Sequence, residues 1–211
     1  MNKIRANVNE SVERPVQVGR KWASSGDTRR RVVEGAVEVF SERGYAEATV
    51  SDVVARSGVS TGSIYHHFGG KGELFLAIWQ ELSTAVEDRM QASLQIEGVD
   101  AAEKFEVAVR AYLWGMWEFR KEAMVLASGD APKGFEAVRR KRMLESTGRM
   151  VAVLGLGTTP QDRLVTRFII AVLGEGAYTV AGARDREYAE LVIEETVQWL
   201  GRMGPGRAQG R

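Results

Sequence analysis

The sequence predicts an all-α protein of about nine helices, in which three N-terminal helices form a small unit ahead of a longer helical body. Two observations favour this fold class. Apolar residues recur at intervals of three and four along most of the 211 residues, which is the spacing of one face of a helix. Alternating runs rich in valine, isoleucine and threonine, which would indicate strands between hairpin turns, do not appear in the sequence.

The first helix is expected to begin at Asp27, because aspartate is a favourable N-cap residue. Its apolar side chains fall three, four and seven residues apart, at Val33, Ala36, Val37 and Phe40. Gly44 then suits the left-handed conformation that commonly closes a helix. These features predict one amphipathic helix of about four turns.

Two short helices follow, and both are marked by their caps. Thr49 precedes Asp52 by three residues, which is the spacing of a capping box. The helix that starts there is expected to stop at Gly58. Ser60 can cap the next helix, which carries Ile64 on its apolar side and ends before a pair of glycines.

Six further helices are predicted in the body, separated by breaks that contain glycine or proline. Their expected ranges are 73–96, 100–122, 124–127, 132–154, 160–183 and 185–203. The predicted organisation is therefore a flexible basic tail over residues 1–26, a three-helix unit over 27–72, a helical body over 73–203 and a disordered tail over 204–211.

Composition excludes several classes of function. The charges of the 29 basic and 28 acidic residues nearly cancel, so the molecule as a whole has no strong electrostatic attraction to nucleic acid or membrane. The chain has no cysteine and only two histidines, at adjacent positions, which excludes disulfides and thiol nucleophiles. The N-terminus lacks the apolar stretch of a secretory signal, and the longest nearly uncharged run, 168–183, is interrupted by Glu175. We therefore expect a cytoplasmic protein without a transmembrane segment.

The second and third helices, joined by a tight turn at Gly58, form a predicted helix-turn-helix. In such a motif the second helix can lie in the major groove of DNA. Its apolar side would face the first helix, while its other side offers hydroxyl, imidazole and phenol groups that suit phosphate oxygens and base edges. These candidate DNA-binding residues are Ser60, Thr61, Gly62, Ser63, Tyr65, His66 and His67. Lys71 adds a cation after the helix, and Arg29 and Arg30 add two at the start of the first helix.

Residues 32–79 carry a resemblance to a known family. They read VVEGAVEVFSERGYAEATVSDVVARSGVSTGSIYHHFGGKGELFLAIW. The order of a phenylalanine, a Gly-aromatic pair, a threonine, a Gly-Val-Ser turn and an aliphatic-Tyr-x-His-Phe ending resembles the TetR family of bacterial transcriptional regulators. The resemblance covers about a quarter of the chain, and the body is compatible with the family in length and helicity.

The resemblance also implies roles for individual residues. Thr61, Gly62 and Ser63 match positions that touch bases, and Tyr65, His67 and Lys71 match positions that touch phosphates. Thr49 and Ser51 match further contacts to the DNA backbone. The sequence GGKG at residues 69–72 departs from the polar-Lys-acid pattern of the family, which predicts a less firmly capped start of the fourth helix.

Other readings of these residues are weaker. Adjacent helical residues point about 100° apart, so His66 and His67 alone do not form a metal site, and no cofactor is expected. The GGKG stretch lacks the remaining residues of a phosphate-binding loop. Residues 1–71 carry 11 basic and 8 acidic residues. The basic tail at 1–26 suits either a contact to the minor groove of DNA or a solvated arm. The basic cluster at 139–142 is better explained as a solvated helix face than as a second DNA-binding surface.

The aromatic-rich segment 105–119 predicts a central helix that is buried on several sides. In a TetR-like body it would border a cavity for a small hydrophobic, flat effector. The residues expected to line this cavity are Tyr112, Met116, Trp117, Met143, Phe168 and Val172. Simple packing without a cavity remains the alternative for each of them. Arg110, Glu118 and Glu175 would either orient the ligand or reach solvent.

The last two long helices are apolar on more than one side, which favours a two-fold interface between two copies of the chain. The expected interface residues are Ile169, Leu173, Gly176, Ala177, Val192, Thr196 and Trp199. The predicted function is thus a homodimeric, ligand-responsive repressor of a palindromic double-stranded DNA operator, and not an enzyme. Two alternatives stay open: a non-specific nucleic-acid-binding or scaffold protein, and an enzyme with its active site in the body.

Overall fold

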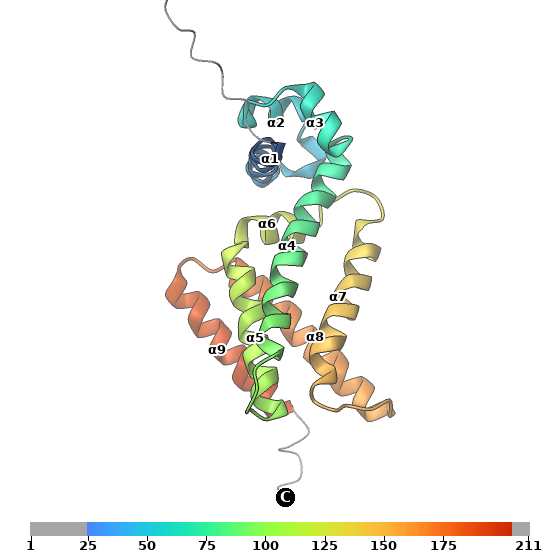
Figure 1. Cartoon of the computed structure of the whole chain (residues 1–211), viewed down its shortest axis with the longest axis vertical. Helices are drawn as coiled ribbons and strands as arrows, with labels where there is room; N and C mark the ends of the chain where they lie inside the picture. Colours follow the sequence, from blue (N-terminus) through green and yellow to red (C-terminus); the bar gives the residue numbers. More distant parts are fainter. Residues whose placement is uncertain (1–24, 204–211) are drawn as a thin grey trace, which may run out of the picture.

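The structure, a computed structural model, describes residues 25–203 and confirms the all-α prediction. Within that range it contains nine helices and no strand (Figure 1). They are α1 (Ser25–Glu47), α2 (Val50–Ser57), α3 (Thr61–Phe68), α4 (Lys71–Leu94), α5 (Ala101–Glu118), α6 (Arg120–Ala127), α7 (Phe135–Ala152), α8 (Pro160–Ala181) and α9 (Arg186–Met203). The predicted tails lie outside the described residues, except that Ser25 and the glycine after it begin α1.

Helices α1 to α3 form a head at one end of the molecule (Figure 1). Its core is built from the apolar stripe of α1 together with Val53, Val59, Ile64 and Phe68. A side-chain carbon at Gly35 of α1 would lie 3.1 Å from the side chain of Ser57, so α1 and α2 pack closely there. Gly58 has φ 65° and ψ 21°, the left-handed cap that the sequence predicts at the turn.

Two predictions about α1 need correction. The helix begins at Ser25, so Asp27 lies within its first turn. Gly44 has a positive φ of 77°, as expected, but its ψ of 162° is not that of a left-handed helical cap. The chain bends at Gly44 and helical structure continues to Glu47. The segment after the bend packs through Tyr45, whose ring meets those of Phe40 and Phe75 in the core.

The long helix α4 runs from the head into the body, where α5 packs beside it (Figure 1). The core of the head continues along the first half of α4 and includes Phe135 at the start of α7. The predicted single helix at 100–122 is wrong, because the chain breaks at Phe119, which has φ −100° and ψ 32°. No glycine or proline marks this break. Phe119 packs partly against the core of the head, so tertiary packing sets the bend.

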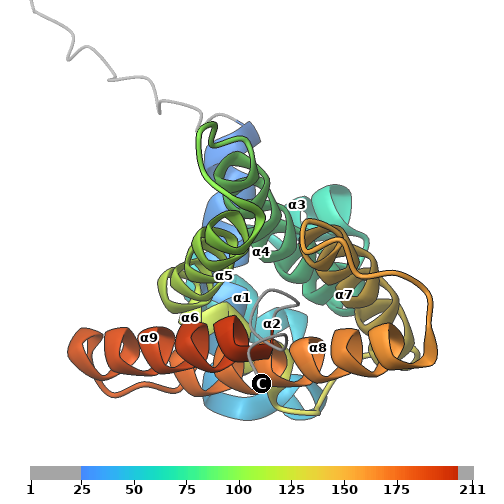
Figure 2. The same ribbon diagram turned by 90° about the horizontal axis from the view of Figure 1, so that it is seen from below.

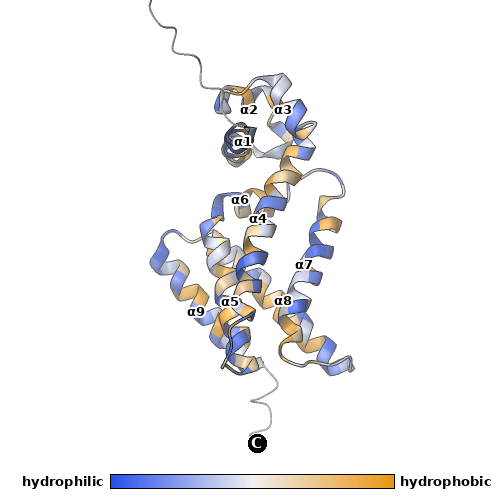
Figure 3. Ribbon diagram, in the orientation of Figure 1, coloured by the Kyte–Doolittle hydropathy of each residue, from blue (hydrophilic) through white to orange (hydrophobic). Residues whose placement is uncertain are grey.

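Helices α8 and α9 form a layer on one side of the body (Figure 2), and both pack on α5. By length and composition alone, α8 could cross a membrane. In this fold α8 buries Ile169, Leu173 and Val180 against its neighbours, and 33% of its most apolar stretch is buried. Bands of hydrophobic and hydrophilic residues alternate along the helices of the body (Figure 3), as amphipathic packing requires.

Candidate functional site

The outward face of α3 is polar and open. Thr61, Gly62, Tyr65 and His66 are exposed, while Ile64 points into the core. Tyr65 leaves 53% of its surface exposed, which is unusual for an aromatic residue on a short helix. A side-chain carbon at Gly62 would have no neighbour within 4 Å, so another backbone can approach there. Ser63 and His67 are half-buried at the edges of the same face.

The charge around this face suits a polyanion. No aspartate or glutamate occurs from Val53 to Gly72, so the turn and α3 carry no acidic side chain of their own. The nearest acid along the chain, Glu73, lies beside Gly69 and Gly70 at the C-terminal end of α3. The face offers neutral donors, and these can read base edges or bind phosphate oxygens. It therefore combines the two properties that a DNA-reading helix needs, an open approach and an absence of repulsion.

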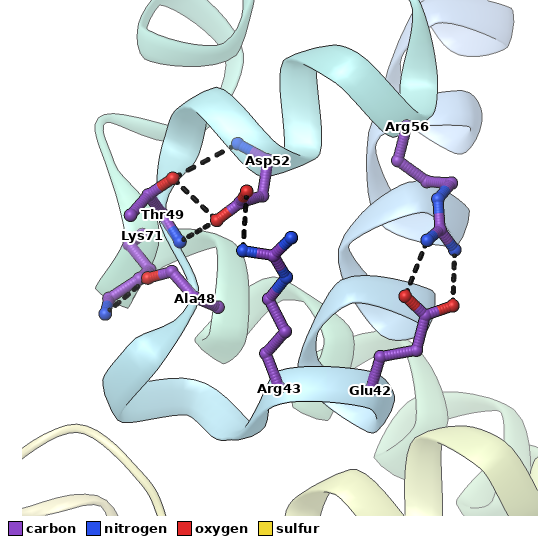
Figure 4. A network of polar contacts seen from close by, with 7 residues as sticks. All are labelled: Glu42, Arg43, Ala48, Thr49, Asp52, Arg56 and Lys71. Carbon is purple, nitrogen blue, oxygen red and sulfur yellow. Dashed lines mark hydrogen bonds and ion pairs between the residues drawn. The ribbon is translucent and has the colours of Figure 1, made fainter.

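The helix before the turn is held rigidly by a local polar network (Figure 4). The backbone nitrogen of Thr49 donates to Asp52 Oδ2 at 2.9 Å, and the backbone nitrogen of Asp52 donates to Thr49 Oγ1 at 3.2 Å. This is the predicted capping box. Arg43 adds an ion pair to Asp52 at 3.0 Å. The hydrogen bonds from Thr49 and the charge of Arg43 hold the pKa of the Asp52 carboxyl below its ordinary value, so the box stays intact at neutral pH.

Two of the predicted DNA-binding residues, Thr49 and Ser60, are already engaged with the protein. The Thr49 hydroxyl also donates to Asp52 Oδ2 at 2.7 Å. Ser60 Oγ caps α3 by accepting from the backbone nitrogen of Ser63 at 3.3 Å. Ser51 is exposed and carries no such bond in the described part of the chain. Their contacts to DNA stay predictions.

Lys71 is engaged with the protein itself. Its ammonium donates to the backbone oxygens of Tyr45, Ala46 and Ala48 at 2.8, 3.1 and 2.9 Å and lies 4.5 Å from the centre of the Tyr45 ring. Figure 4 shows the Lys71 side chain beside Ala48. All three ammonium hydrogens are therefore used inside the protein. Lys71 thus fastens the start of α4 to the end of α1, and its phosphate contact stays a prediction.

This fastening matters because α4 has no other side-chain cap. Its N-cap is Gly70, which makes no side-chain hydrogen bond to the helix, as the GGKG sequence predicts. Asp130, from the connection between α6 and α7, reaches the same place and accepts from the backbone nitrogen of Ala46 at 2.8 Å. The end of α1 is thus held from both α4 and the body. Sequence spacing could not reveal these contacts, because Asp130 lies 84 residues from Ala46.

Replacing Lys71 with methionine is expected to lower the free energy of unfolding by about 1.5–3 kcal/mol, because hydrogen bonds from a charged group are lost and carbonyls are left unpaired. Chemical denaturation would measure this loss, with Lys133→Met as the control for removing one exposed lysine charge. If Lys71→Met left the free energy of unfolding unchanged and weakened the salt dependence of DNA binding, Lys71 would instead contact phosphate.

The basic residues at the start of α1 also divide into two groups. Arg29 pairs with Glu81 of α4 and lies over the Phe68 ring, 5.2 Å from its centre. Arg31 donates to the backbone oxygen of Ser57 at 2.7 Å. Both side chains therefore connect helices of the head. Arg30 is more open, since its side chain is 68% exposed and pairs with acids of its own helix, and it remains the better candidate for a phosphate contact.

A cavity of about 320 Å³ lies in the body among helices α4 to α8. Three of the predicted lining residues, Tyr112, Met116 and Met143, border it. Trp117, Phe168 and Val172 do not. The prediction for Phe168 is wrong because 53% of its surface is exposed on α8. Trp117 and Val172 pack instead against the core formed by α5, α8 and α9.

The largest omission from the predicted lining is α4, which contributes six residues to the cavity. They are Trp79, Leu82, Ser83, Val86, Glu87 and Met90. Their spacing places them along one side of the helix, so the row was visible in the sequence. The sequence could not show that this side of α4 faces a cavity, because the other side of α4 is apolar as well.

The predicted two-fold interface also needs correction. Ile169, Leu173, Ala177 and Thr196 are buried within the subunit itself, and a side-chain carbon at Gly176 would lie 2.9 Å from the Thr196 side chain. Gly176 and Thr196 join α8 to α9, and Ala177 borders the cavity, so these buried residues are not available to a second copy. Val192 is half-buried. Of the predicted set, Trp199 is exposed, at 54% of its surface.

The apolar residues that α8 and α9 do present to solvent form an outer face, which we name the α8–α9 face. It comprises Leu164, Phe168, Tyr178, Tyr188, Leu191 and Trp199, of which Tyr178 also borders the cavity. On each helix they lie opposite the residues that pack on α5. Six large apolar side chains on one side of a small protein form the kind of exposed patch that marks an interaction surface.

Comparison with known proteins finds relatives of the head. Residues 32–78 match the family described as bacterial regulatory proteins, tetR family. The A-factor receptor protein of Streptomyces griseus is 33% identical over 90 residues, which are 43% of this chain and 33% of that protein. The HTH-type transcriptional repressor AcnR of Corynebacterium efficiens is 46% identical over 55 residues, 26% of this chain and 29% of the repressor. The chain thus spans about a third of the length of these relatives.

The whole fold has solved counterparts. A TetR-like transcriptional regulator from Rhodococcus sp. RHA1 superposes with a TM-score of 0.68 over 88% of this chain and 98% of that one, at 22% identity. PfmR, a TetR family transcriptional regulator from Thermus thermophilus, gives a TM-score of 0.63 over 84% and 96% of the two chains, at 20% identity. At these identities the likeness concerns the fold alone.

Proposed function

We propose that the chain, which matches the tetR family of bacterial regulatory proteins over residues 32–78, is a ligand-responsive transcriptional repressor that binds a palindromic operator as a homodimer. One observation carries the DNA-binding part of this proposal. The outward face of α3 is open at Gly62, polar, and free of acidic residues, and it stands on a head whose helices are capped and cross-linked by ion pairs. This function places the protein in the cytoplasm.

The α8–α9 face supports the homodimer. A two-fold interface uses the same patch on both copies, and a patch that spans two adjacent helices would form a four-helix contact. Trp199 lies within it with Arg202 stacked over its ring at 5.1 Å, and aromatic and arginine side chains are enriched in the energetic centres of interfaces. Two recognition helices would then meet half-sites about one helical turn of DNA, roughly 34–36 Å, or a multiple of it apart.

The cavity supports the regulation by a ligand. It borders α4 over three turns, and the first residue of α4, Lys71, is bonded to the end of α1. A ligand that shifts α4 would therefore move the head and change the separation of the two recognition helices. A coupling free energy of about 1–3 kcal/mol is enough for a useful switch. We propose that the ligand releases the operator.

The cavity also argues for a sensor instead of an enzyme. Among the described residues that line it, Glu87 is the one carboxylate, and it is paired with Arg142 at 3.3 Å and with Arg149. A carboxylate held between two guanidinium groups is a poor general base, because both cations favour its charged form.

Selection of bound duplexes from a random library, followed by footprinting, tests the DNA-binding proposal. We expect two symmetric half-sites, protection on one side of the duplex, and an affinity that falls steeply as salt concentration rises. Uniform protection without a selected sequence would favour the non-specific nucleic-acid-binding alternative, and a failure to bind any duplex at low salt would contradict both.

A further inference from the structure

The two arginines that border the cavity differ in how firmly they are paired with acidic residues. Arg142 is occupied, since it pairs with Glu87 and lies over the Trp79 ring at 5.6 Å. Arg139, one turn earlier on α7, also borders the cavity. Its described partner is Glu136 on the same helix, at 2.7 Å, and both side chains of that pair are about half exposed. Exposed pairs of this kind contribute little, so Arg139 can exchange its partner at low cost.

A second donor lies near this cation. Tyr112 extends from α5 into the cavity, and its hydroxyl has no hydrogen bond in the described part of the chain. Every described side-chain oxygen or nitrogen that is fully buried has a partner, so the Tyr112 hydroxyl must be open to the cavity. The charge of Arg139 acts on it, because Arg139 lowers the pKa of the phenol against the larger effect of burial, which raises it. Arg139 and Tyr112 both line this one cavity, so the guanidinium and the hydroxyl can contact the same ligand.

The rest of the cavity is apolar and adaptable. Leu82, Met90 and Met116 form walls from α4 and α5, and methionine side chains can adjust to irregular ligands. With Glu87 neutralised by its two arginines, the lining keeps an excess of positive charge at Arg139. The volume of about 320 Å³ lies near the lower end of the range for small-molecule sites.

We propose that the effector is a small amphipathic anion, with a carboxylate or similar acidic group held by Arg139 and Tyr112 and an apolar part against α4 and α5. This inference rests on the effector cavity of the proposed function and narrows its ligand from a hydrophobic molecule to an acidic one. Arginine recognises carboxylates through two parallel hydrogen bonds, and a phenol hydroxyl donates to an anion. Neutral molecules of the same shape leave both donors unused.

Calorimetric titration of the full-length protein with decanoate, decanol and decylamine tests the charge preference, because the three probes share one chain and differ in the head group. A second pair, 2-naphthoate and 2-naphthalenemethanol, repeats the comparison with a flat apolar part. We expect at least one carboxylate to bind, and to bind about tenfold or more tighter than its alcohol, with decylamine the weakest of its series. Equal binding of acid and alcohol, tighter binding of the amine, or no binding of either carboxylate would overturn the proposal.

Variants assign the preference to its residues. Arg139→Gln should abolish the advantage of the carboxylate while leaving the binding of the alcohol unchanged, and Arg139→Lys should restore part of it. Tyr112→Phe should weaken carboxylate binding by about fivefold. The matched control is Arg140→Gln, which removes the neighbouring exposed arginine outside the cavity and should change nothing. A carboxylate preference that survives Arg139→Gln would contradict the assignment.

Operator binding is measured separately, so that the two proposals fail independently. Loss of the carboxylate preference in a protein that binds its selected duplex would overturn the ligand class alone. A protein that binds the carboxylate through Arg139 but no duplex would overturn the proposed function and leave the anion site standing.

Discussion

Replacing Gly62 with glutamate is expected to lower operator affinity by at least about 100-fold while leaving the head folded. Gly62 lies in the first turn of α3, exposed, with open space around it. Glutamate is a better helix former than glycine, and a negative charge near a helix N-terminus is favourable. The variant should therefore be as stable as the parent or slightly more so. Toward DNA it places a carboxylate against phosphates, and such like-charge contacts cost several kcal/mol.

Fluorescence anisotropy with the selected duplex at fixed salt measures this effect. The control is Ala137→Glu, which adds the same charge to an exposed position of α7 and should change affinity only slightly. A Gly62→Glu protein that keeps the parent affinity would show that α3 does not enter the groove.

Replacing Phe168 with arginine is expected to convert the proposed dimer to a monomer at micromolar concentrations, weakening self-association by about 100-fold or more. Phe168 is central to the exposed row of α8 and points away from the core of its own subunit, so the substitution spares the fold. In a two-fold contact each change occurs twice, and truncating a central aromatic residue commonly costs about 2 kcal/mol or more. Sedimentation velocity measures the state of association.

Val138→Arg is the matched control, since Val138 is also about half exposed, on α7 and outside the α8–α9 face. It should leave the dimer intact. Operator affinity should fall for Phe168→Arg alone, because a monomer reads one half-site. A Phe168→Arg protein that sediments as a dimer would place the interface on another surface.

The sequence predicts the head well because its determinants are local. The capping box of Thr49 and Asp52, the left-handed Gly58 and the cap at Ser60 each act within four residues, and all are present in the structure. The burial of Ile64 and the exposure of Tyr65 follow from helical spacing. These features define α3 and its open face without knowledge of the body.

The body is less predictable because its helices are apolar on more than one side. In α8, Phe168 and Ile169 are equally hydrophobic neighbours, and the choice of which faces the core depends on how the helix is rotated against α5. The prediction placed Phe168 inside and Ile169 outside, and the structure has the reverse. Lys71 illustrates the same limit for polar residues, because its partners lie 23 to 26 residues away and depend on the bend at Gly44.

The absence of native cysteine permits the most direct measurement of whether α3 reads DNA. A protein with Thr61→Cys, carrying an iron chelate that cleaves DNA on the single thiol, should cut the selected duplex at a few positions inside each protected half-site. The same chelate on Ala137→Cys should cut weakly or not at all. Cleavage spread evenly along the duplex, or equal cleavage from the two positions, would contradict the insertion of α3 into the groove.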